Sequence, residues 1–75
     1  MSALRYLAYK TRATKGKEHL HWLELLRNYI KNTDMETLVR EVETITTDEE
    51  LKAIQEAGAR GELYNIIRKK LGGVE

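Results

Sequence analysis

The sequence predicts an all-α fold: a compact bundle of three to four short helices with a basic N-terminal arm or an extra short helix. Three observations lead to this prediction. The chain contains no proline, β-branched residues rarely occur in runs, and apolar residues recur at helical spacing. Because 75 residues suit one small domain, we expect a basic segment at 1–16 and a single helical domain at 17–75.

Residues 17–31 form the first predicted helix of the domain. Apolar side chains recur along this segment, and their stripe is wide enough to face two neighbours. We therefore expect this helix at the centre of the bundle, followed by a tight connection at Asn32 and Thr33. The stripe comprises Leu20, Trp22, Leu23, Leu25, Leu26, Tyr29 and Ile30.

Two capping patterns mark the starts of the next two predicted helices, at 34–45 and 48–57. In a capping box, a Thr before the helix and a Glu three residues later each satisfy a free amide at the helix end. An apolar face follows each box, so both starts are well defined. The two boxes are Thr33 with Glu36 and Thr47 with Glu50.

Glycines interrupt the helical pattern between residues 57 and 61. Gly58 and Gly61 would each destabilise a helix interior by about 1 kcal/mol. The helical spacing of the apolar residues before them also does not continue after them. We therefore expect a break here and a last helix at 62–71. Gly72 and Gly73 should end this helix, because glycine is common after a helix C-terminus.

The apolar faces of these helices predict one shared core. A core of this size leaves a small domain only marginally stable, so we expect a homodimer or a domain that a partner stabilises. The predicted core residues are Leu23, Leu26, Ile30, Leu38, Val42, Leu51, Ile54, Leu63 and Ile67.

The formal net charge of +1 conceals blocks of opposite sign. Residues 1–17 carry five cations and no acid, whereas residues 33–57 carry eight acids and two cations. Residues 58–71 carry four cations and one acid, and 18–32 are balanced. Such an uneven distribution bears on partners and electrostatic steering rather than on the fold.

The basic start of the chain is the first candidate functional segment. Cations interleaved with tyrosines suit phosphate contact combined with base stacking. With five phosphate contacts, the logarithm of the binding constant would fall with the logarithm of the salt concentration at a slope of about −4 to −5. Two alternatives remain open: the cations solvate the outer face of a terminal helix, or they meet the acidic block of another subunit. The residues concerned are Arg5, Tyr6, Tyr9, Lys10, Arg12, Lys15 and Lys17.

Residues 49–71 form the second candidate, with the order helix, glycine turn and basic helix. A helix-turn-helix module would place the last helix in the major groove, although the acids of the preceding helix would repel phosphate. The cations at the end also have a structural explanation, because they favour the negative end of a helix. The residues that would contact nucleic acid are Asn65, Arg68, Lys69 and Lys70, with Glu62 on the same face.

No pattern in the chain supports catalysis, a cofactor or a metal site. Cysteine is absent, and no glycine-rich phosphate loop is present. His19 and His21 lie about 200° apart on a helix, so they cannot bind one ion from a single face. The longest wholly apolar run, Tyr6–Tyr9, is far shorter than the roughly 20 residues of a membrane span. We therefore expect no enzyme, no small-molecule substrate and no membrane contact.

No motif is specific enough to assign a family, so the sequence supports two functional hypotheses. The first is a small non-enzymatic cytoplasmic regulator that acts near nucleic acid, for example in transcription. It would use the basic N-terminal segment and the basic last helix for phosphate contact. The alternative is a protein-interaction module, an adaptor or inhibitor that works through its acidic face and exposed apolar surface and can self-associate.

Overall fold

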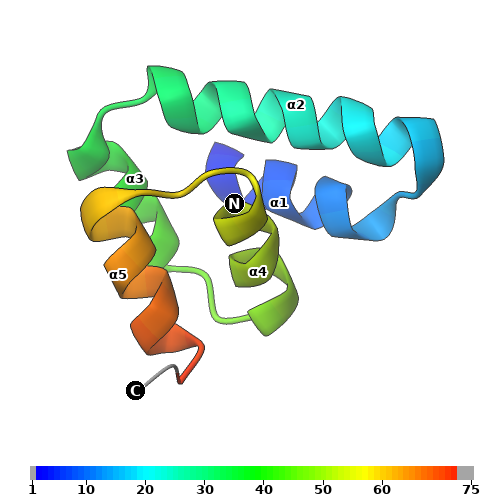
Figure 1. Ribbon diagram of the computed structural model, residues 1–75. Coiled ribbons are helices and arrows are strands. Elements are labelled where there is room, and N and C mark those ends of the chain that lie inside the picture. Colours follow the sequence, from blue (N-terminus) through cyan, green and yellow to red (C-terminus); the bar gives the residue numbers. More distant parts are fainter. Residues whose placement is uncertain (1, 73–75) are drawn as a thin grey trace.

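The computed structural model describes residues 2–72, and these form five α-helices with no strand among them. The all-α prediction is confirmed. The bundle exceeds the predicted three to four helices because residues 3–13 also form a helix that packs into it (Figure 1). The helices are α1 (Ala3–Ala13), α2 (Gly16–Asn32), α3 (Met35–Glu43), α4 (Asp48–Glu56) and α5 (Gly61–Lys70).

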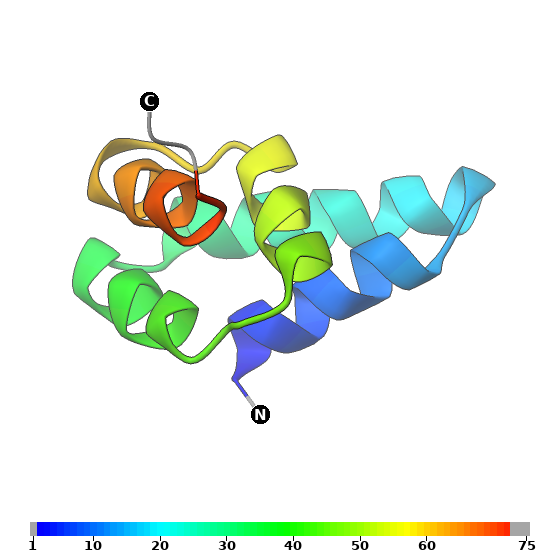
Figure 2. The ribbon, with the colours of Figure 1, turned by 90° about the horizontal axis from the view of Figure 1, so that it is seen from below.

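The longest helix, α2, runs along one side of the molecule and forms an antiparallel pair with α1 (Figure 1). At the end of α2, α3 and α5 lie side by side, and both are seen nearly end-on in Figure 2. The shorter α4 contacts α1, α2 and α5 and so connects the two halves of the bundle. No helix within residues 2–72 has the length and hydropathy needed to cross a bilayer.

All five helices contribute to one core. The predicted core residues are buried except Leu23, which is half-buried because it lies at the edge of the face that α2 turns inward. The predicted core omitted five buried apolar residues that lie in α1, in α4 or beside a turn. These are Leu4, Ala8, Ile45, Ala53 and Ala57.

The N-terminal segment is a docked helix. Ser2 caps it, because its hydroxyl oxygen accepts a hydrogen bond from the amide of Arg5 at 3.1 Å. Leu4 and Ala8 are fully buried, one turn apart, on the face that α1 turns toward its neighbours. Thr11 continues this face, and its buried hydroxyl donates to the carbonyl oxygen of Leu7 at 2.8 Å, so it is not left without a partner.

One carboxylate joins the first three helices. Glu41 of α3 accepts from the amide of Leu4 at 3.2 Å and from the hydroxyl of Tyr29 at 3.0 Å. The Leu4 amide belongs to the first turn of α1, which has no partner within the helix. Burial raises the pKa of Tyr29 above its ordinary value, and the hydrogen bond to Glu41 raises it further.

The two predicted capping boxes are wrong in detail, although each helix begins within one residue of its expected start. Asp34, not Thr33, is the N-cap of α3, and its carboxylate accepts from the amide of Thr37 at 3.0 Å. Asp34 directly precedes the first residue of α3 and so lies one residue closer to the free amides than Thr33. Thr47 does precede α4, but its side chain makes no capping hydrogen bond.

The expected break after α4 is confirmed. The amide of Gly58 donates to Gln55 and that of Ala59 donates to Ile54, a pairing that ends a helix in a left-handed residue. Gly58 has a φ of +107°, which side chains other than glycine rarely adopt. At the end of α5 Gly72 has a φ of +77°, and Gly73 lies outside the described residues.

Leu4→Ala tests the docking of α1. We expect the free energy of unfolding to fall by about 2 to 5 kcal/mol, because the substitution leaves a cavity at a fully buried site. Urea unfolding followed by circular dichroism measures the change. Tyr9→Ala, on the exposed side of α1, is the control. An unchanged midpoint for Leu4→Ala would show that α1 is not packed in solution.

Asp34→Ala tests the cap of α3 through its pH dependence. Hydrogen bonds from the hydroxyl and the amide of Thr37 hold the pKa of Asp34 below its ordinary value of 3.8. The stabilisation is therefore present above pH 3.8 and is lost as the pH falls through the folded-state pKa. We expect the variant to melt below wild type at pH 7, with a smaller difference in Tm at acid pH. Asp34→Asn should retain the cap without this pH dependence, and a pH-independent difference for Asp34→Ala would contradict the assignment.

Candidate nucleic-acid interface

Two of the five N-terminal cations pair with acids of the same chain. The Nε atom of Arg5 lies 3.3 Å from the Oε1 atom of Glu50, and the Nη2 atom of Arg12 lies 2.8 Å from the Oε1 atom of Glu49. Both acids belong to the first turn of α4. The basic segment therefore meets the acidic block within one chain, and these two guanidinium groups are engaged before any ligand binds.

The two ion pairs differ in their surroundings. Glu50 is only 7% exposed, so its carboxylate depends on Arg5 for a partner. Glu49 and Arg12 both lie on the surface, where solvent screens their attraction. The Arg5 pair thus belongs to the structure of the α1–α4 contact, whereas the Arg12 pair can open at little cost.

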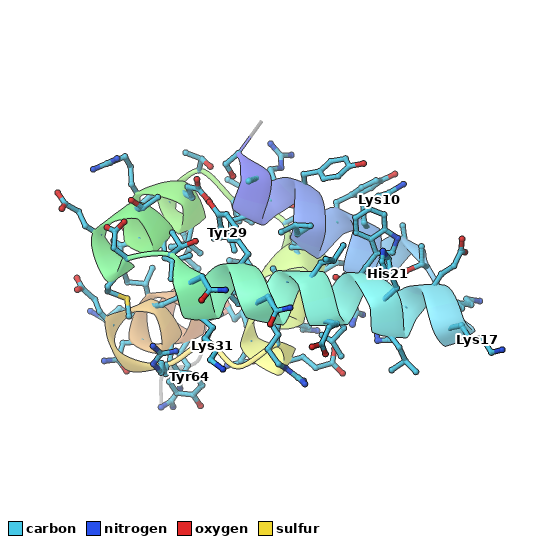
Figure 3. All side chains as sticks on the ribbon, turned by 90° about the horizontal axis from the view of Figure 1, so that it is seen from above. Lys10, Lys17, His21, Tyr29, Lys31 and Tyr64 are labelled. Carbon is cyan, nitrogen blue, oxygen red and sulfur yellow. The ribbon has the colours of Figure 1, made fainter. Side chains whose placement is uncertain are left out.

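Lys10 lies among aromatic rings on the outer side of the α1–α2 pair. Its Nζ atom is 5.4 Å from the centroid of the Trp22 ring and 6.0 Å from that of Tyr6. The Tyr6 and His21 rings both meet Trp22 edge to face, at centroid distances of 6.0 and 5.4 Å. We call Tyr6, His21 and Trp22 the aromatic cluster. Figure 3 shows Lys10 and His21 together on this side of α2.

Lys15 and Lys17 lie at the turn that joins α1 to α2, next to the aromatic cluster along both helices. Both side chains are exposed, and neither forms an ion pair with any residue in 2–72. The turn is tight because Gly16 begins α2 with a φ of +63°. Glu18 is the acid that follows directly in the chain. This end of the molecule therefore combines three lysines, one acid and the aromatic cluster.

Tyr9 faces a different part of the surface. Its ring is 52% exposed and lines a groove of about 400 Å³ together with Arg12, Glu49 and Glu50. The two acids make this groove unsuitable for phosphate. The structure thus separates Tyr9 from Tyr6, although the sequence prediction placed them in one interface.

The predicted contacts on α5 lie at the other end of the molecule. Asn65, Arg68 and Lys69 are exposed and Lys70 is half-buried, and the guanidinium carbon of Arg68 is 5.8 Å from the Tyr64 ring centroid. Figures 1 and 2 both place α5 away from the turn between α1 and α2. The structure therefore does not bring the two predicted basic regions together.

The segment from α4 to α5 has the order of a helix-turn-helix module. Leu63 and Ile67 are buried and the face with Glu62, Asn65 and Lys69 is exposed, as that interpretation requires. The first turn of α4 nevertheless holds Asp48, Glu49 and Glu50. These carboxylates lie where a helix-turn-helix protein would approach the phosphate backbone, and they would repel it.

Three cations outside the predicted set line a surface groove where the end of α2 meets the turn after α4. They are Arg27, Lys31 and Arg60. Counting charges by blocks hid the first two, because Glu18 and Glu24 balance them in the sequence. Their spacing of four residues on one helix was the signal that could have revealed them.

The two histidines have separate roles. The Nδ1 atom of His19 donates to the carbonyl oxygen of Thr11 at 2.8 Å and so joins the start of α2 to the end of α1. His21 is exposed and lies against Trp22. Within residues 2–72 no three His, Cys, Asp or Glu side chains converge in a way that could hold a metal ion.

A scan against protein-family models, a search of curated proteins and a search of solved structures each found no match.

Arg5→Ala and Arg12→Ala should differ in their effect on stability. Arg5→Ala leaves the buried Glu50 carboxylate without its partner, so we expect a loss of about 1 to 2 kcal/mol in the free energy of unfolding. Arg12→Ala should cost less than about 1 kcal/mol, because its pair is exposed. Chemical denaturation at pH 7 measures both variants, and equal losses would contradict the structural role of the Arg5 pair.

Proposed function

We propose that this protein is a small non-enzymatic regulator that binds nucleic acid at the end of the bundle where α1 meets α2. One observation carries the proposal. Unpaired lysines and the aromatic cluster occupy the same end of the molecule, where Lys10 lies within 6.0 Å of two rings. Bases stack on aromatic rings whatever their sequence, and lysines neutralise the phosphates between them.

In the proposed complex, Lys15 and Lys17 contact phosphates while bases stack on exposed rings of the aromatic cluster. Tyr6 is 45% exposed, so its ring remains accessible beside Trp22. Lys10 lies over the rings and can contact a phosphate whose base stacks there. Stacking requires unpaired bases, so a single strand or a loop fits this surface better than a continuous duplex.

The basic end of α5 makes a separate contact in this proposal. The longest extent of the molecule is 33 Å, which corresponds to about ten nucleotides of a fully stacked strand at 3.4 Å each, and a more extended strand would span it with fewer. Arg68, Lys69 and Lys70 would then contribute to long ligands only. Because the first turn of α4 is acidic, we place no phosphate backbone against it.

The test uses Trp22, the only tryptophan of the chain. We expect a ten-nucleotide single strand to quench Trp22 fluorescence at low salt, with a log–log salt slope of about −2 from the three lysines. Lys15→Gln combined with Lys17→Gln should weaken binding several-fold, whereas Arg40→Gln combined with Lys52→Gln should not. Both double variants remove the same charge, so they separate a local site from general attraction.

Absence of quenching and of a gel shift at low salt would contradict the proposal. That outcome would favour the second candidate, an interaction module that docks a protein or another copy of the chain. The observation in its favour is Leu20 on α2, whose side chain is 63% exposed, with Leu25 also exposed. Covering Leu20 with a partner would remove its apolar surface from water, which favours association.

A further inference from the structure

A second cationic site lies at the other end of α2, where the helix meets the turn between α4 and α5. The groove there has a volume of about 340 Å³, within the range of small-ligand sites. Buried side chains of Ile30 and Ala57 form part of its wall, and Gly58 leaves it open on one side. Figure 3 shows Lys31 at this end of α2, far from Lys17.

All charged residues that line the groove are cations. Arg27 and Lys31 project from one face of α2 because they are four residues apart, and Arg60 joins them from the turn before α5. All three are exposed, and none forms an ion pair with a residue in 2–72. Like charges at this spacing repel each other along the helix, while Lys31, in the last turn of α2, also favours the negative end of the helix.

Acids are close in the chain but do not line the groove. Glu24 lies one turn before Arg27, and Glu56 and Glu62 lie on either side of the turn that carries Arg60. Asp34 lines a neighbouring pocket with Arg60, but its carboxylate is engaged by Thr37. The side chains that line the groove therefore carry a local excess of positive charge, which suits an anionic ligand.

We propose that this groove binds a phosphate group between Arg27, Lys31 and Arg60. Two guanidinium groups and one ammonium group suit a tetrahedral dianion, because guanidinium presents a fork of donors that matches two of its oxygens. Tyr64 lies one turn after Arg60 on α5 and is exposed, but it does not line the groove. The phosphate can belong to a nucleic-acid strand or to a free phosphate compound.

Pyrophosphate is the probe for the site itself. We expect titration of the ¹⁵N-labelled full chain at low salt to shift the amide signals of residues 27–31 and 57–61 in a saturable manner. Lys31→Gln combined with Arg60→Gln should lower the affinity about fivefold or more. If this double variant does not fold, the single Lys31→Gln variant replaces it, with an expected loss of about twofold or more.

The matched control is Arg40→Gln combined with Lys52→Gln, which removes one Arg and one Lys that are exposed elsewhere. An equal loss of affinity in the control, or shifts spread over all surface lysines, would overturn the proposal. So would the absence of any saturable shift. Because pyrophosphate has no base to stack, this result does not depend on the nucleic-acid proposal above.

A ten-nucleotide thymidine strand distinguishes the two sources of phosphate. Shifts of the same amides with both probes would show that a strand reaches the groove and would support a phosphate site on the nucleic-acid path. Shifts with pyrophosphate alone would support a site for a free phosphate compound. Shifts with neither would overturn the site.

Discussion

The burial of α1 against α2 and α4 is the contact on which the rest of the structure depends. A chain of this length has few apolar side chains, and α1 supplies Leu4 and Ala8 to the centre of the core. The same helix presents Arg5 to Glu50, so apolar burial and the neutralisation of a buried acid occur together. Without α1, the inner face of α4 would expose apolar surface and an unpaired carboxylate.

This contact also decides which charges remain on the surface. Glu50 and Glu49, in the first turn of α4, form ion pairs with Arg5 and Arg12. The basic N-terminal segment therefore presents less positive charge to solvent than its sequence indicates. Most of the other exposed cations lie at the two ends of α2, in the turn before α5 and on α5, whereas Arg40 and Lys52 lie on α3 and α4. The molecule is therefore polarised along its length, with the acidic start of α4 between the ends. A polyanion would meet this protein at its ends rather than along α4.

Sequence reasoning recovered what depends on local pattern. The helix positions, the break at Gly58 and most of the core follow from spacing and backbone preference, which neighbouring residues determine. The details that failed depend on three-dimensional packing. The cap of α3 is a local exception, in which Asp34 rather than Thr33 accepts the hydrogen bond because it directly precedes the helix. The Arg5–Glu50 pair joins residues 45 positions apart, and Tyr9 was separated from Tyr6 by the packing of α1 against α4. Neither the spacing of apolar residues nor the charge of sequence blocks indicates such contacts.

The hydrogen bond from the Leu4 amide to Glu41 has a consequence for the order of folding. The two residues are 37 positions apart, and the partner of Arg5 comes later still. Helix α1 is therefore synthesised before the helices that satisfy its amide and its guanidinium group. Until α3 and α4 follow, α1 can form only its local pair with α2, so the bundle closes once those two helices are available.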